Sequence, residues 1–308
     1  MEIAVGVERS QWRGERSDAH LIEALGPGAM LFAVADGFGG SAKGVPSADS
    51  ALGTLRDYLR RRRRLGAFAR SASSAGLRSI LLSALEHTNA RLFSLGGSHD
   101  DFVGSGASLT ALLVVGGHAF VAHVGDARAY LVRLGSAEML TADDAIPVAE
   151  PAGGTAAPSS LVAMPRMRSL LWRSLGTQRK LEASIGHVEL RSGDCLALCT
   201  DGVHRCFEDG ELAALLPSDA AVSAADRVAR ILGIVRARGG LDDGTLLVAR
   251  DIDGAPAENG SVATSRRARS RIAFLLLLLM LASFGAYALR IDDFNHHPAP
   301  LSARVEPR

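Results

Sequence analysis

Cysteine is scarce in this chain, and its few occurrences exclude the structures that cysteine builds. The 308 residues include 3 cysteines, which are Cys195, Cys199 and Cys206. An odd number at this spacing supports neither a disulfide framework nor the pattern of a zinc finger or a redox pair. We expect three reduced thiols beside a strand, in an intracellular compartment.

Charge of one sign and aromatic side chains are also in short supply. The 34 basic residues balance 33 acidic ones, which leaves a formal net charge of +1 and indicates no nucleic-acid partner. Aromatic residues make up 5% of the chain while 33 residues are glycine, which predicts tight turns and a core of small aliphatic side chains. The N-terminus lacks a basic start followed by an apolar run, so we expect no signal peptide.

One long apolar run lies near the C-terminus. Residues 272–289 contain no charge, and these 18 residues in a helix span about 27 Å, close to the hydrocarbon thickness of a membrane. The alternative is a fully buried helix of a soluble domain, but the run has no polar face. Charged residues flank it asymmetrically: Arg266, Arg267, Arg269 and Arg271 before it, Asp292 and Asp293 after it. The positive-inside rule then predicts a single-pass protein of the cell (inner) membrane with its large N-terminal part in the cytoplasm.

Composition divides the chain into four parts. Residues 1–250 form one soluble domain, and residues 251–271 are small and polar, as in a linker. The membrane span over 272–289 and a short extracytoplasmic tail over 290–308 follow. Inside the domain, residues 149–160 are typical of a mobile surface insertion.

Short β-rich runs alternate with helical patterns through the domain. Strands are expected at Met30–Ala35, Leu109–Val115, Ala119–Val124, Ala129–Leu134, Cys195–Cys199 and Thr245–Ala249. Helices are expected at Ser47–Arg63, Leu77–Leu95 and Ala221–Arg238. The turn Gly116-Gly117-His118 predicts a hairpin. Consecutive hairpins with segregated helices favour an α+β fold of antiparallel sheets covered by helices over a doubly wound parallel sheet.

Five arginines, Arg60–Arg64, end one predicted helix. Cations at that position complement the helix dipole, which is the simpler interpretation. Contact with anionic lipid or an acidic partner is the alternative, because a membrane span is expected in the same chain.

Aspartates recur beside or just after apolar runs, and most of them are next to glycine. They are Asp18, Asp36, Asp126, Asp201 and Asp242. One Asp-Gly pair is an ordinary turn, but several at successive strand ends converge on one edge of a sheet. Converging carboxylates repel one another unless a cation neutralises them, and oxygen-only ligands suit Mg²⁺ or Mn²⁺. The pattern predicts a two-metal hydrolytic site in which an acidified water is the nucleophile.

The order of these segments resembles the signature blocks of the metal-dependent Ser/Thr protein phosphatases, the type 2C or PPM family. The blocks are VADGFGG, GASLTALLV, HVGDARAYL, LCTDGV and GGLDDGTLLV, and LLWRSLGTQRKLEASI is similar to the segment before the last strands. The resemblance covers residues 1–250. It implies a four-layer αββα sandwich of two mostly antiparallel sheets flanked by helices, and hydrolysis of phosphoserine and phosphothreonine in proteins.

The resemblance also implies metal ligands. Asp36 looks like the aspartate that bridges the two metal ions, and Gly37 like the residue that offers its backbone carbonyl to one of them. Asp201 and Asp242 match the aspartates that complete the dinuclear site. Asp126 matches the aspartate of a third, weaker ion in bacterial members. We therefore expect two or three Mn²⁺ or Mg²⁺ ions.

Two further positions match family residues that bind the substrate or metal-bound water. Three other positions depart from the family pattern. Arg13 matches the arginine that holds the substrate phosphate, for which a guanidinium fork is suited, and Asp18 matches the acidic residue that contacts metal-bound water. Ser17 replaces an acidic or amide residue, Phe38 replaces a histidine that some members have, and Asp243 replaces the usual asparagine. These departures favour an alternative function, a catalytically weak phosphatase-like domain that acts as a membrane-tethered binding or scaffolding module. The expected substrate is a phosphoprotein, such as a bacterial-type Ser/Thr kinase or its targets.

A serine and a threonine lie close in sequence to two histidines, which is a combination that nucleophilic enzymes use. Ser108 and Thr110 are near His118 and His123. No nucleophile elbow surrounds them and they fall in predicted strands, so we expect them to have packing roles.

Overall fold

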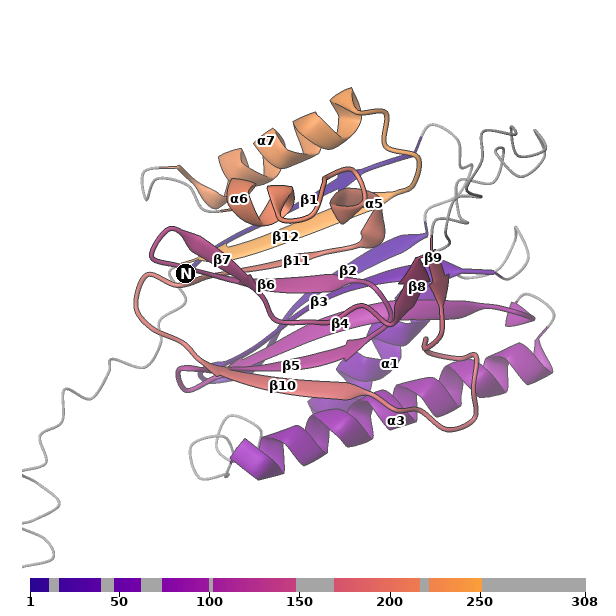
Figure 1. Ribbon diagram of the computed structural model, residues 1–308. Helices are drawn as coiled ribbons and strands as arrows, with labels where there is room; N and C mark the ends of the chain where they lie inside the picture. Colours follow the sequence, from indigo (N-terminus) through magenta and orange to yellow (C-terminus); the bar gives the residue numbers. More distant parts are fainter. Residues whose placement is uncertain are drawn as a thin grey trace, which may run out of the picture. The chain divides into compact units, whose positions relative to one another are not determined.

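The computed structural model describes residues 1–10, 17–39, 47–61, 74–99, 102–147, 169–216 and 222–250 (Figure 1). The chain divides into two units, Met1–Pro256 and Ala257–Arg308, and the second lies entirely outside these ranges. Several predicted features lie outside them as well: Arg13, the insertion at 149–160, the linker at 251–271, the span at 272–289 and the tail at 290–308. Within the described ranges, no helix has the length and apolar character needed to cross a membrane.

Two five-stranded sheets make up the middle of the first unit (Figure 1). The first sheet has the spatial order β1 (Glu2–Glu8), β12 (Gly244–Arg250), β11 (Cys195–Cys199), β6 (Arg128–Arg133) and β7 (Ser136–Met139). The second has the order β10 (Ser184–Glu189), β5 (His118–Val124), β4 (Gly106–Val115), β3 (Ala29–Phe38) and β2 (Asp18–Gly26). A separate short pair joins β8 (Ala145–Pro147) to β9 (Ser169–Leu171). Neighbouring strands are antiparallel throughout.

Helices cover the outer face of each sheet (Figure 1). The second sheet carries α1 (Ser47–Arg61) and α3 (Ser74–Ser98). The first sheet carries α5 (Asp201–His204), α6 (Glu211–Leu215) and α7 (Ala224–Ala237). The α+β class with two antiparallel sheets flanked by helices is therefore confirmed.

Side-chain alternation along the strands explains why the layers stack. In β4 all ten residues are buried. Leu112 and Val114 face the other sheet, whereas Leu113 and Val115 face the helices, because successive side chains point to opposite faces of a sheet. A strand covered on both faces has to be apolar at every position, which is why such strands are visible in the sequence as continuous runs.

Most predicted elements are confirmed, and their ends shift by a few residues. The hairpin between β4 and β5 turns through Gly116 and Gly117, whose φ angles of 56° and 80° suit glycine at both central positions. The sequence analysis did not predict the edge strands of the two sheets (β1, β2, β7 and β10), the short pair β8 and β9, or the short helices α5 and α6.

The arginine run is described only at its start. α1 ends at Arg61, and the Nε of Arg60 donates to Glu23 Oε1 on β2 at 2.6 Å. Arg62, Arg63 and Arg64 lie outside the described residues. Because this ion pair is largely exposed, its contribution to stability is small.

Candidate active site

The pairing of β2 with β3 brings the first two candidate aspartates together. The strands are antiparallel, so the start of β2 lies opposite the end of β3, and Asp18 is the register partner of Asp36. The prediction that both lie at turns after strands is wrong, because Asp18 begins β2 and Asp36 lies inside β3. Antiparallel pairing nevertheless places both at the same edge of the sheet.

Asp18 connects the two sheets by hydrogen bonds. Its Oδ2 accepts from the hydroxyl of Thr200, just before α5, and from the hydroxyl of Thr245 on β12, each at 2.7 Å. The backbone N–H of Thr245 in turn donates to the Thr200 hydroxyl at 2.9 Å. Within the described part of the chain, the other carboxylate oxygen, Oδ1, is buried without a hydrogen-bond partner. Asp18 is therefore fixed in place with one oxygen left for a ligand.

Asp126 lies on the turn that leads from the second sheet to the first, and Asp201 follows β11 of the first sheet. Asp201 is the first residue of α5, and Asp126 follows β5 on the turn to β6. The guanidinium of Arg205 contacts both carboxylates, at 2.6 Å from Asp126 Oδ2 and 2.8 Å from Asp201 Oδ2. The second oxygen of Asp201, Oδ1, is buried and has no hydrogen-bond partner among the described residues.

Ser108 and Gly125 shape the turn between β5 and β6 that contains Asp126. Gly125 has a φ of 102°, and a Cβ there would lie 2.6 Å from the Ser108 hydroxyl. This hydroxyl accepts hydrogen bonds from the backbone N–H groups of Asp126 and Ala127, at 3.1 and 2.8 Å. Ser108 is thus a structural residue that supports the Asp126 turn.

Thr110 and His123 have structural roles too, as expected. The Thr110 hydroxyl donates to the carbonyl of Ala127 at 2.6 Å and hydrogen-bonds with His123 Nδ1 at 2.8 Å. His123 is 1% exposed, and burial lowers its pKa. His118 instead hydrogen-bonds with His187 at an exposed position. These side chains support the strands rather than form a nucleophile and base.

Asp243 holds both ends of the stretch 11–16, which contains Arg13. Its Oδ1 accepts from the backbone N–H of Ser10 and its Oδ2 from the backbone N–H of Ser17, both at 2.9 Å. Each N–H donates to a different oxygen of the carboxylate, and asparagine would place an NH₂ group, which cannot accept, at one of these two positions. The departure at Asp243 therefore has a structural reason, and the sequence analysis missed it.

Gly37 has to be glycine for reasons of space. A Cβ at this position would lie 2.6 Å from the Ser47 hydroxyl and 2.9 Å from the backbone nitrogen of Ala48, at the start of α1. Its N–H donates to the carbonyl of Ser17 at 2.9 Å. The next residue, Phe38, packs its ring against Gly106, where a Cβ would lie 2.5 Å from the ring. The backbone after Asp36 is therefore closely surrounded.

The pKa shifts reflect the burial of these carboxylates. Burial raises the pKa of Asp18 to about 8, and the charges of Asp201 and Asp243 add to that effect. Burial likewise raises the pKa of Asp126 to about 6; Asp201 adds to this increase, whereas Arg205 opposes it. A nearby cation stabilises the ionised form of a carboxylate whose pKa is raised by burial.

Some candidate ligands, but not all, keep an oxygen atom available to a hard divalent ion. The candidate ligands are oxygen atoms, and Asp18 and Asp201 each keep one buried oxygen free of hydrogen bonds. Asp242 differs, since its Oδ1 accepts from the N–H of Asp243 at 2.8 Å. Among the described residues, no group of three or more His, Cys, Asp or Glu side chains is arranged to hold a metal ion. The assignment of Asp36, Gly37, Asp201 and Asp242 as ligands stays a prediction.

Comparison with known proteins decides the family. The pattern described as "Protein phosphatase 2C" matches residues 6–243. This chain belongs to the protein phosphatase 2C family. The serine/threonine protein phosphatase PstP of Mycobacterium tuberculosis is 29% identical over 246 residues, which cover 77% of this chain and 44% of PstP. This phosphatase 2C chain thus matches less than half the length of that relative.

Solved structures agree with the phosphatase 2C fold. The serine/threonine phosphatase of S. agalactiae has a TM-score of 0.65 at 23% identity, and the match covers 80% of this chain and 98% of that one. The catalytic domain of PstP in complex with 2 manganese ions has a TM-score of 0.58 at 25% identity, and the match covers 81% and 97%. The resemblance that the sequence motifs carried is confirmed at the level of family and fold.

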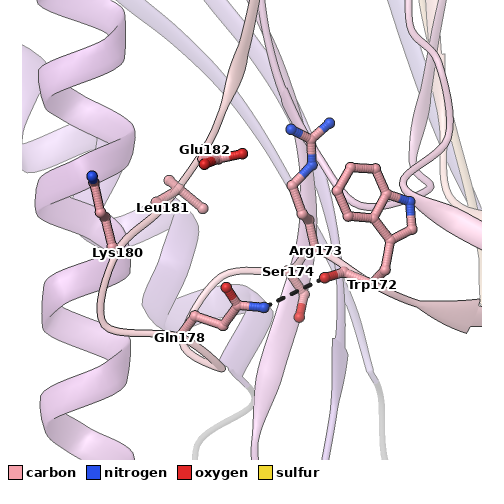
Figure 2. A pocket seen from close by; sticks show the side chains of 7 residues that line it. All are labelled: Trp172, Arg173, Ser174, Gln178, Lys180, Leu181 and Glu182. Carbon is pink, nitrogen blue, oxygen red and sulfur yellow. Dashed lines mark hydrogen bonds between the residues drawn. The ribbon is translucent and has the colours of Figure 1, made fainter.

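A pocket of about 330 Å³ in this phosphatase 2C domain is lined by the segment between β9 and β10 (Figure 2). Trp172, Arg173 and Lys180 line it, and the Arg173 guanidinium stacks on the Trp172 ring at 4.1 Å. Arg173 also pairs with Asp144 at 2.5 Å, and Asp144 accepts from the N–H of Gly125, the residue before Asp126. Arg173 therefore connects the pocket lining, through Asp144, with the backbone of the turn before Asp126.

The raised pKa of Asp18 predicts a pH dependence of stability in the absence of metal. The folded state binds this proton more tightly than the unfolded state, whose pKa is near 3.8. The contribution of Asp18 to the free energy of unfolding therefore falls as pH rises from about 4 to about 8, and above about pH 6.5 the buried His204, whose pKa is lowered from 6.5 to about 4, no longer opposes it. In Asp18→Asn the fall above about pH 6 disappears, while the part due to Asp126 stays. Urea unfolding in EDTA at successive pH values measures the free energy of unfolding of the wild type and of Asp18→Asn. If this free energy changes equally with pH above pH 6 in the two proteins, the prediction is contradicted.

Proposed function

We propose that this chain is a metal-dependent protein phosphatase that hydrolyses phosphoserine and phosphothreonine in proteins. The observation that carries the proposal is the buried carboxylate cluster of a phosphatase 2C domain, in which Asp18 and Asp201 each keep a buried oxygen without a hydrogen bond. The name of PstP, a serine/threonine protein phosphatase, supports the same activity and substrate class. Phosphoproteins are therefore the substrates that we assign to it.

The proposed mechanism uses the chain's residues in three roles, and the first is to hold metal ions. Asp36, Gly37, Asp201 and Asp242 would hold two Mn²⁺ or Mg²⁺ ions, and the structure of the PstP catalytic domain in complex with 2 manganese ions supports that number. When bound, such ions supply an acidified water as nucleophile and positive charge for the phosphoryl oxygens.

The remaining roles belong to residues around the ions. We propose that Asp18 orients the attacking water through its free Oδ1, and that Arg13 binds two oxygens of the substrate phosphate. Phe38 has no proton to donate, so the leaving alkoxide takes its proton from water.

The scaffolding alternative rested on Ser17, Phe38 and Asp243. One of these residues has a structural role that is compatible with an active enzyme, because Asp243 holds the backbone of Ser10 and Ser17. The enzyme interpretation is therefore the one we favour.

Metal removal tests the proposed activity. The full chain treated with EDTA should release no phosphate from a phosphothreonine peptide above background, and Mn²⁺ should restore turnover, since the carboxylates alone supply no nucleophile. The measurement is phosphate release over time, with Ca²⁺ added in place of Mn²⁺ as a control for general charge neutralisation. Turnover that is equal in EDTA and in Mn²⁺ would falsify the proposal.

We also propose that residues 251–271 link the catalytic domain 1–250 to a membrane span at 272–289, with the tail 290–308 outside the cell (inner) membrane. A membrane-anchored phosphatase fits a kinase of the same membrane, or the targets of that kinase, as substrate. The charge asymmetry around the apolar run supports this orientation.

Fractionation tests the anchor. The full chain should sediment with membranes and resist extraction by alkaline carbonate, whereas a chain that ends before Arg266 should stay in the supernatant. Immunoblotting of both fractions measures the distribution, with phosphatase activity as the control for folding. If both chains distribute equally, the anchor is refuted.

A further inference from the structure

Arg205 places its guanidinium between two aspartates of the candidate site. It follows α5 directly, one turn after Asp201, and its Nη1 lies 2.8 Å from Asp201 Oδ2. Its Nη2 lies 2.6 Å from Asp126 Oδ2, on the turn after β5. One side chain thus bridges two carboxylates that come from different elements.

The surroundings of Asp126 keep this bridge in place. The backbone carbonyl of Asp126 hydrogen-bonds with His204 Nε2 at 2.8 Å, and its N–H donates to the Ser108 hydroxyl at 3.1 Å. His204 is 6% exposed, so it is enclosed at this position beside Asp126. The positive charge beside Asp126 comes from Arg205, for which burial is unfavourable but is outweighed by the neighbouring carboxylates, so its pKa is raised.

We infer that Arg205 is a built-in cation that neutralises Asp126 in place of a third metal ion, so that this chain binds two ions. The inference rests on the proposed function, because it concerns the metal content of the same site. An ion that approached Asp126 Oδ2 would meet a fixed positive charge that already donates a hydrogen bond to that oxygen.

The same bridge leaves the two-metal site intact. Arg205 contacts Oδ2 of Asp201 and leaves the buried Oδ1 without a hydrogen bond among the described residues. One oxygen of Asp201 therefore serves the arginine while the other is available to an ion. For Asp126 the arginine already supplies the positive charge, so this carboxylate needs no metal ion for neutralisation.

The number of Mn²⁺ ions bound per chain tests the inference without reference to activity. The full chain in detergent is dialysed against increasing Mn²⁺, and bound metal is measured by atomic absorption until the count stops rising. We expect two ions in the wild type and two in Asp126→Asn. We expect a third ion in Arg205→Met, which keeps the length of the side chain and removes its charge, and two again in Arg205→Lys and in the double variant Arg205→Met/Asp126→Asn.

The outcomes separate this inference from the proposed function. A wild type with three ions, one of which is lost in Asp126→Asn, overturns the inference and leaves the proposed function standing. A folded Arg205→Met with two ions also overturns it, with circular dichroism as the check of folding. Fewer than two ions in the wild type overturns both. The comparison of wild type with Asp126→Asn decides the question even where Arg205→Met does not fold.

Discussion

Asp36→Asn is expected to lower the Mn²⁺-dependent kcat/KM toward a phosphothreonine peptide by more than about 100-fold. Loss of a residue that only orients a metal ligand costs 10- to 100-fold, and loss of a bridging ligand should exceed that range. Asparagine has nearly the same size, so the pairing of β2 with β3 around Asp18 should be kept. What the substitution removes is one negative charge and one acceptor oxygen at the centre of the site.

Asp57→Asn is the matched control for this variant. Asp57 lies on α1, its side chain is 52% exposed, and its partner Arg56 is the preceding residue on the same helix. The same chemical change there should leave both kcat/KM and Tm unaltered, because an exposed ion pair contributes little. If Asp36→Asn keeps activity within tenfold of wild type while Tm is unchanged, Asp36 does not have the role proposed for it.

Gly202→Ala is expected to destabilise the domain more than other single-methyl additions. A Cβ at Gly202 would overlap the carbonyl oxygen of Asp243 and lie 2.6 Å from its carbonyl carbon, which is backbone and has little room to move. Overpacking of this kind costs about 3 kcal/mol, which corresponds to a fall in Tm of roughly 6–12 °C for a domain of this size. Because Asp243 holds Ser10 and Ser17, activity should fall together with stability.

Gly53→Ala supplies the comparison. Gly53 lies inside α1, and a Cβ there would meet no atom within 4 Å. Alanine in a helix interior is more favourable than glycine by about 0.5–1 kcal/mol, so this variant should be slightly more stable than wild type. Thermal unfolding by circular dichroism measures both variants in EDTA. Equal Tm values for Gly202→Ala and wild type would show that the turn at Asp243 yields easily, against the prediction.

The strands that sequence patterning predicted are those covered on both faces. β4 is buried at all ten positions and β11 at all five, so each is a continuous apolar run in the sequence. The edge strand β1 is mostly half-buried, and β2 alternates between exposed and half-buried residues through its middle. Short alternating or half-exposed segments resemble loops in composition, so neither strand was predicted.

The candidate site was predictable only as far as its local motifs reach. Asp36, Asp126 and Asp201 each follow or end an apolar run, and that pattern identified them. The partners that fix these residues come from far along the chain: Thr200 is 182 positions from Asp18, and Thr245 is 227 positions away. Such contacts depend on how the two sheets stack, which no local pattern encodes.

The contacts of Arg205 could not be predicted from the sequence either. In the sequence it is one basic residue after LCTDGVH, and nothing marks it as different from the other arginines. Its function follows from one turn of helix, which returns its side chain to Asp201, and from the packing of the two sheets, which brings Asp126 within 2.6 Å.

The order of strands in the first sheet has a consequence for biosynthesis. β12, the last strand in the sequence, lies between β1 and β11 in space, so β1 pairs with its neighbour only after residue 250 has left the ribosome. Until then the edge of β1 that will pair with β12 stays unpaired, and an unpaired strand edge is a site for misassociation and for chaperone binding. Because Thr245 and Asp243 arrive with that strand, nascent or prematurely terminated chains should carry no competent site. Catalytic competence should then appear in a single step when the domain is complete.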